Sequence, residues 1–194
     1  MEKPVLAVAG IGATGVVLAA ALLSRDPDVL VVDPQPGLAE SLARNGLRVS
    51  GEIHYQVPVK QVFSGIKALK AHRPDVVFVA TKTFHLPRVL EDLEAVFRPG
   101  MKIVSTHNGL GTEDVIADKF GAESALRMSL NYGVSLKGPG QVETAFFNRP
   151  NHLGGLVPET RETGLWLSDA LTAAGLDTAY VDDIKAYVWK KMIM

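Results

Sequence analysis

Three glycines stand at the spacing Gly-x-Gly-x-x-Gly near the start of the chain, at positions 10, 12 and 15. The first glycine of such a segment permits a tight turn, the second lets the backbone approach a phosphate, and the third lets a helix pack closely on a strand. The N-terminus of the following helix offers free N–H donors to an anion. The segment is therefore predicted to cradle the diphosphate of a dinucleotide, the alternative being a glycine-rich turn without a ligand. Its residues are Gly10, Ile11, Gly12, Ala13, Thr14 and Gly15.

An acidic residue, Asp33, follows the last of these glycines by about twenty residues, at the end of a second apolar run. Dinucleotide-binding folds place a carboxylate at this point to bond the adenosine ribose hydroxyls. Because a carboxylate repels the 2′-phosphate of NADP, Asp33 favours NAD, although Arg25, Arg44 or a loop residue could compensate its charge. The alternative is a turn aspartate before Pro34.

The elements that must position these residues follow from hydrophobic periodicity and from breakers. Apolar runs predict strands at 5–9, 29–32, 76–80, 102–105 and 179–181, with further β-forming segments at 47–57 and 125–147. Helical patterns cover 13–24, 38–44, 65–71, 86–97, 112–119 and 160–173, and Asp182-Asp183 caps a helix that runs to the end. Strands alternating with helices predict an α/β protein of Rossmann type, with a doubly wound, mainly parallel sheet and helices on both faces.

The composition argues against several other kinds of protein. With 47% hydrophobic residues, 21% charged residues and a net charge of −1, the 194-residue chain gives no reason to expect nucleic-acid binding. It has no cysteine and no histidine pair at ligand spacing, so no metal site is expected. Residues 5–23 carry no charge and approach the length of a membrane span or signal peptide, but their glycines and the mixed charges before them argue against both.

Further segments carry a resemblance to a known family, in matching order and spacing. These are Ala80-Thr81-Lys82, the run from His107 to Gly111 (His-Asn-Gly-Leu-Gly), the turn from Gly138 to Val142, the pair Gly154-Gly155, and Val188-Trp189-Lys190-Lys191. Together with the glycine-rich segment, they make the whole chain resemble the ketopantoate reductases. The resemblance implies NAD(P)H-dependent reduction of a 2-oxo acid, 2-dehydropantoate to pantoate, on the route to coenzyme A. It also implies a cytoplasmic location, and it favours NADP where Asp33 favours NAD.

The same resemblance assigns roles to particular residues. Thr81 would lie at the cofactor, Lys82 near the nicotinamide and the substrate, Asn108 would bond substrate or cofactor, and Lys191 would be the general acid. Hydride addition to a ketone leaves an oxyanion, which needs a donor aimed at it and a proton source. Helical periodicity supports Lys191, because Ile184, Tyr187 and Val188 form an apolar stripe whose next position it occupies. The alternative for Lys191 is a lysine whose stem covers apolar surface, and for Lys82 a solvated loop lysine. The alternative for Asn108 is an ordinary Asn-Gly turn.

The resemblance also divides the chain. Residues 1–181 would form the NAD(P)-binding domain, and 182–194 would begin the first helix of a helical C-terminal substrate domain that is absent here. The apolar ending Lys-Lys-Met-Ile-Met suggests truncation, so we expect the chain to bind dinucleotide but turn over poorly alone. The expected partner is a small 2-oxo acid, without nucleic acid or membrane, and a homodimer stays open. Two other functions also stay open: a dehydrogenase for another 2-oxo acid, imine or sugar acid, and a non-catalytic nucleotide sensor.

Overall fold

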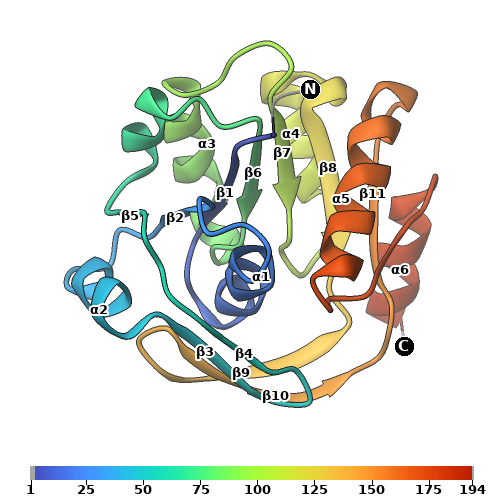
Figure 1. The fold of residues 1–194 in the computed structure, drawn as a ribbon. Helices are drawn as coiled ribbons and strands as arrows, with labels where there is room; N and C mark the ends of the chain where they lie inside the picture. Colours follow the sequence, from blue (N-terminus) through green and yellow to red (C-terminus); the bar gives the residue numbers. More distant parts are fainter. Residues whose placement is uncertain (1–2, 194) are drawn as a thin grey trace.

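The computed structural model describes residues 3–193 and contains one large and one small sheet (Figure 1). The large sheet has the order β12-β11-β8-β7-β6-β1-β2-β5. The six strands from β5 to β8 are parallel, β11 runs antiparallel to β8, and β12 is parallel to β11. A mainly parallel sheet was predicted and is confirmed. The strands are β1 (Leu6–Ala9), β2 (Leu30–Val32), β5 (Val62–Phe63), β6 (Val76–Val79), β7 (Lys102–Ser105), β8 (Ala125–Ser129), β11 (Asn151–Gly155) and β12 (Thr178–Tyr180).

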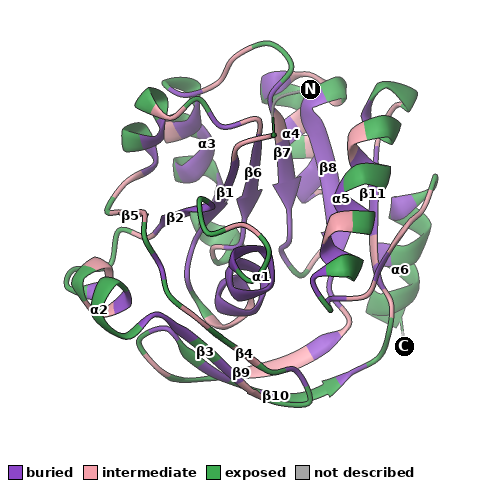
Figure 2. Ribbon diagram, in the orientation of Figure 1, coloured by how far each residue is buried: buried purple, intermediate pink, exposed green. Residues whose placement is uncertain are grey.

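Helices cover both faces of this sheet, and a hydrophobic core lies between the sheet and the helices on each face. One core joins the sheet to α1 (Ala13–Leu23) and α5 (Arg161–Ala173). The other joins the opposite face to α3 (Leu86–Glu94) and α4 (Thr112–Phe120). The strands between the helices are buried along nearly their whole length, as Figure 2 shows. This is the doubly wound arrangement that alternating strands and helices predict.

The helix predicted at 65–71 is a 3-10 helix, Ile66–Ala71. The segment buries only Ile66 and Leu69, so it is held by two apolar contacts and not by a continuous apolar stripe. Further helical elements are α2 (Leu38–Asn45) and three 3-10 turns, Thr83–His85, Ala122–Ser124 and Pro158–Thr160.

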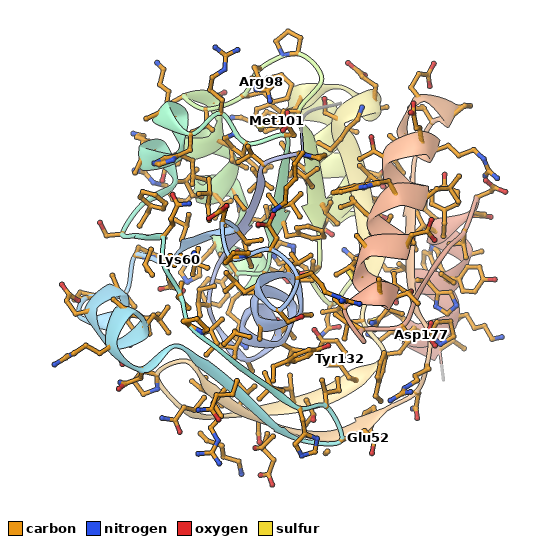
Figure 3. The ribbon with its side chains drawn as sticks, viewed as in Figure 1. Glu52, Lys60, Arg98, Met101, Tyr132 and Asp177 are labelled. Carbon is orange, nitrogen blue, oxygen red and sulfur yellow. The ribbon has the colours of Figure 1, made fainter. Side chains whose placement is uncertain are left out.

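The small sheet has the order β4-β3-β10-β9, and its strands lie in the two segments, 47–57 and 125–147, that were predicted as β-forming. Its strands are β3 (Leu47–Gly51), β4 (Tyr55–Val57), β9 (Tyr132–Gly138) and β10 (Gln141–Phe147). It packs on the side of α1 that faces away from the large sheet, and the Tyr132 hydroxyl donates to the Thr14 carbonyl over 3.3 Å (Figures 1 and 3). Every residue of α1 from Gly15 to Leu23 is buried. A helix enclosed on all sides needs no polar face, which explains the uncharged run at 5–23.

None of the helices described between residues 3 and 193 has both the length and the apolar character that crossing a bilayer requires. The last helix, α6 (Ile184–Ile193), packs its buried Ile184 and Val188 against β11 and β8. A Cβ atom on Gly154 would come within 2.4 Å of the Val181 carbonyl oxygen, so only glycine lets the start of α6 approach β11 so closely. Lys185 Nζ bonds Asp114 Oδ1 of α4 at 2.6 Å. These contacts set the position of α6, while the domain boundary at residue 181 stays a prediction.

Candidate functional site

Five neighbouring strands, β2, β1, β6, β7 and β8, end at one edge of the large sheet. The segments after the first four hold residues that the sequence predicted for the site, and the segment after β8 contacts a further predicted site residue. In sheet order these segments hold Asp33, the glycine-rich loop, Thr81 and Lys82, Asn108, and Leu130. The chain leaves β1 toward β2 on one side and reaches β6, β7 and β8 on the other. Open α/β sheets bind ligands at the carboxyl edge where the strand order reverses in this way. The predicted site residues are therefore gathered along one edge.

Glycine is needed at the three positions of the loop for different structural reasons. Gly10 has φ +95°, and a Cβ atom on it would lie 2.7 Å from the Thr81 nitrogen. A Cβ atom on Gly15 would lie 1.8 Å from the Gly10 carbonyl oxygen, so these two glycines are required by the protein's own packing. Gly12 has an ordinary φ of −76°, and a Cβ atom there would meet no protein atom within 4 Å. Its glycine leaves room beside the loop, as a bound diphosphate would need.

The N-terminus of α1 has the form of an anion site. Its cap residue is Gly12, no side chain caps the first turn, and no acidic residue lies in that turn. The first amides of a helix have no partner within the helix, so those of α1 are available to an external acceptor. The loop follows β1 directly and opens α1, which confirms the predicted strand-turn-helix context.

Asp33 lies beside this loop, half-buried at the end of β2. Its Oδ2 accepts the Ile11 amide hydrogen over 2.7 Å and its Oδ1 accepts that of Gln35 over 2.9 Å. The second bond is the turn contact that the alternative interpretation expects, and the first ties the carboxylate to the glycine-rich loop. Arg25 follows the far end of α1, and its guanidinium bonds the Ala173 carbonyl of α5. The guanidinium of Arg44 bonds the Glu40 carbonyl within α2. Neither arginine is directed at Asp33.

At the other end of the edge, the last helix meets the loop after β7. Lys191 Nζ lies 3.3 Å from Asn108 Oδ1 and also donates to the Leu130 carbonyl oxygen. Although Lys191 is exposed as a residue, its ammonium group is partly buried at these contacts. Desolvation, followed by the positive charge of Arg127, lowers the pKa of Lys191 below its usual value of 10.5. The structure thus brings together the two residues, Lys191 and Asn108, to which the resemblance assigns the chemistry.

Lys82 and Thr81 follow β6, between the glycine-rich loop and Asn108. Lys82 is exposed, and the Thr81 hydroxyl lies 3.3 Å from His107 Nε2. The backbone of Thr81 contacts Gly10 closely, while the hydroxyl of Thr83, two residues on, donates to the Asn108 carbonyl over 3.3 Å. This segment therefore links the glycine-rich loop to the loop after β7.

A buried polar cluster behind this edge was not predicted from the sequence. Arg127 on β8 and Glu113 on α4 have side chains only 2% and 3% exposed, with Nη1 and Oε2 3.5 Å apart. The guanidinium also donates to the hydroxyls of Ser105 and Thr112 and to two backbone carbonyls after β7. The signal that could have revealed it is a single charge inside the apolar run 125–130, because a buried charge requires a partner.

His107 belongs to the same cluster and is only 5% exposed. Its Nδ1 lies 3.0 Å from the Ser105 hydroxyl. Burial and the positive charge of Arg127 lower its pKa to about 4, so it is neutral near pH 7. A neutral imidazole between two hydroxyls fits a structural role for His107. Across residues 3–193 no three His, Cys, Asp or Glu side chains are grouped so as to hold a metal ion.

Known proteins share this fold and sequence pattern. Over 184 residues the chain is 26% identical to 2-dehydropantoate 2-reductase of Streptococcus pyogenes, a match covering 95% of this chain and 59% of the relative. The crystal structure of 2-dehydropantoate 2-reductase from Geobacter metallireducens superposes with a TM-score of 0.86 at 27% identity, covering 97% of this chain and 61% of that one. D-mandelate dehydrogenase, solved with NADH and anilino(oxo)acetate, shares the fold with a TM-score of 0.83 at 23% identity, covering 96% of this chain and 59% of that one.

The chain thus spans about three fifths of the length of the relatives it matches. The sequence profile of the family described as ketopantoate reductase PanE/ApbA matches residues 6–156, which is most of the chain. The chain belongs to the ketopantoate reductase PanE/ApbA family.

Proposed function

We propose that this chain is the nucleotide-binding part of an enzyme that reduces a 2-oxo acid with a nicotinamide cofactor, 2-dehydropantoate to pantoate being the reaction proposed first. The observation that carries the proposal is the contact of Lys191 with Asn108, 3.3 Å apart, at the same sheet edge as the glycine-rich loop. A phosphate-binding loop alone would suit a nucleotide sensor. A partly desolvated ammonium group beside an amide, farther along the same edge, supplies what a ketone reductase needs.

The loop fits a dinucleotide. The space beside Gly12 leaves room for a diphosphate next to the uncapped N-terminus of α1. In this arrangement the amides of the loop and of the first turn would hold the diphosphate, and Asp33 would face the adenosine ribose. When bound, the reduced nicotinamide supplies a hydride to the substrate carbonyl carbon.

Lys191 is the proposed proton donor. As the carbonyl carbon accepts the hydride, negative charge develops on its oxygen, and an ammonium group within reach stabilises that charge and then gives up a proton. Burial lowers the pKa of Lys191 and so eases that release. Asn108 Oδ1 orients the ammonium group, and the exposed Lys82, on a neighbouring strand end, offers a cation for the substrate carboxylate.

The proposed cofactor is NAD in preference to NADP. The carboxylate of Asp33 stands beside the loop, and no cation lies in the segment 33–38 that follows β2. The two arginines considered as compensation bond elsewhere. A 2′-phosphate would therefore meet a negative charge with no positive charge from that segment.

The test is turnover by the natural full-length protein with NADH or NADPH and a panel of carbonyl compounds. The panel holds 2-dehydropantoate, an aryl 2-oxo acid, a branched 2-oxo acid and a cyclic imine. We expect the highest kcat/KM with 2-dehydropantoate and NADH. A higher value with another panel member would reassign the substrate, and dinucleotide binding without turnover of any member would favour a sensor.

A further inference from the structure

Arg127 is a buried charge in an otherwise apolar strand. Its side chain is 2% exposed and its one carboxylate neighbour, among the ion pairs described for residues 3–193, is Glu113. Burial lowers the pKa of Arg127 and the Glu113 carboxylate acts in the opposite direction. Buried ion pairs are often no more stabilising than apolar residues of the same size. Stability alone therefore gives weak grounds for an arginine at this point.

The hydrogen bonds of Arg127 converge on the loop that carries Asn108. Nη2 donates to the carbonyl oxygens of His107 and of Gly109, the latter at 2.9 Å. These two carbonyls come from the residues on either side of Asn108, so one nitrogen fixes the peptide 107–108 directly before Asn108 and the peptide 109–110 one residue beyond it. Gly109 has φ +105°, a conformation that glycine tolerates and that brings its carbonyl back toward the guanidinium.

The other side of the guanidinium is held just as firmly. Nη1 donates to the Ser105 hydroxyl at 3.1 Å and to the Thr112 hydroxyl, and it faces Glu113 Oε2 at 3.5 Å. Ser105 ends β7 and Thr112 begins α4, so the guanidinium spans both ends of the connection between them. The planar fork of arginine can serve both sides at once, which the single ammonium group of lysine cannot do in the same geometry.

We propose that Arg127 is a positioning residue, which holds the turn 107–109 so that Asn108 Oδ1 points at Lys191. The inference rests on the proposed function, because it assigns Arg127 a part in turnover through Asn108. Arg127 has no contact with Lys191 among those described, and the contact that it supports is the 3.3 Å pair between Asn108 and Lys191. Its charge also contributes to the lowered pKa of Lys191.

The test compares Arg127→Lys with the control Arg25→Lys in the natural full-length protein. Arg25 also donates to a backbone carbonyl, that of Ala173 at 2.9 Å, but at the end of α1 away from the site. The measurements are kcat and KM, and hydrogen–deuterium exchange of the loop amides. In Arg127→Lys we expect kcat to fall about 30-fold, since small misplacements of catalytic groups have effects of this order, with the KM for the cofactor unchanged. Exchange should rise about tenfold at 108–111 while β1 and β6 keep their protection.

Glu113→Gln is the second variant, for the case in which Arg127→Lys does not fold. It keeps the guanidinium and removes only the charge that anchors Nη1. We expect the same two effects at a smaller size, with kcat down about fivefold. Normal kcat and normal exchange at 108–111 in the variant that folds would overturn the proposal. So would a uniform loss of protection with kcat per folded molecule unchanged, because that outcome assigns the residue to stability.

A failure of the proposed function is distinguishable from a failure of this inference. If the unsubstituted protein reduces no panel compound, the proposed function fails. The exchange measurement is independent of turnover and still decides whether Arg127 holds the loop. Faster exchange confined to 108–111 then supports the holding role, and unchanged exchange rejects it.

Discussion

The two ends of the candidate site are built in different ways. At the diphosphate end, six consecutive residues from the end of β1 into the first turn of α1 carry the geometry, and two of the glycines are fixed by local backbone contacts. At the reducing end, Lys191 meets Asn108 and Leu130, which are 83 and 61 residues away in sequence. One end is a local backbone feature, and the other is a product of sheet order and helix packing. Substitutions at the first should change binding, and substitutions at the second should change turnover.

The largest effect is expected from Lys191→Met. Removal of the proton donor should lower kcat about 1000-fold, within the range that general acid catalysis contributes, and leave dinucleotide affinity unchanged. The control is Lys190→Met, because Lys190 is the neighbouring exposed lysine on α6. Steady-state kinetics of the natural full-length protein and a binding titration give both values. A similar loss of kcat in the two variants would contradict the assignment of the proton donor to Lys191.

Gly12→Val tests the diphosphate end. A side chain there meets no protein atom within 4 Å, so the fold should tolerate it while the diphosphate loses its place. We expect the dinucleotide Kd to rise about 100-fold, or about 2.8 kcal/mol, with little change in Tm. Gly65→Val is the matched control, because Gly65 also faces open space and has an extended φ of −167°. Fluorescence titration with NADH and a melting curve separate the two effects, and equal affinity in both variants would remove the basis of the site.

The contrast between the two ends also explains what could be predicted. The glycine-rich loop was predicted with its context because a contiguous motif between an apolar run and a helical run carries its own geometry. The large sheet followed from alternation, and its parallel part was correctly predicted for the same reason. Sequence periodicity gives local structure: the loop is itself local, and the parallel sheet follows from the alternating order of local elements.

Long-range pairing could not be read in this way. The joining of β3 with β10, 93 residues apart at Arg48 and Gln141, depends on tertiary packing around α1 and has no local signal. The cluster of Arg127 and Glu113 is likewise assembled from β8 and α4. Lys191 was singled out only by helical spacing and family resemblance, and the packing of α6 on β11 and β8 is what brings it to Asn108.

The pH dependence of stability probes the cluster at the reducing end. The pKa of His107 is lowered from 6.5 to about 4, so the unfolded chain takes up a proton between these values that the folded protein does not. The folded state therefore loses stability as pH falls through this window, by about 2 kcal/mol from His107 between pH 7 and pH 5. In His107→Gln the loss of unfolding free energy over that interval should be smaller by this amount than in the exposed control His85→Gln. The unfolding free energies are measured by urea unfolding at pH 7 and pH 5. An equal loss of unfolding free energy in the two variants would show that His107 is not buried in its neutral form.

The smallest expected effect is at the diphosphate end, in Asp33→Asn, and it separates two roles of one carboxylate. Loss of the bond to the Ile11 amide should weaken both dinucleotides alike, whereas loss of the negative charge should favour only the cofactor that carries a 2′-phosphate. We expect the ratio of the Kd for NADPH to the Kd for NADH to fall about tenfold, or about 1.4 kcal/mol, since the shared loss cancels in the ratio. Asp26→Asn is the control, because Asp26 accepts the Asp28 amide in a similar turn away from the loop. Equal weakening of both cofactors in Asp33→Asn would mean that this carboxylate shapes the loop and does not select the cofactor.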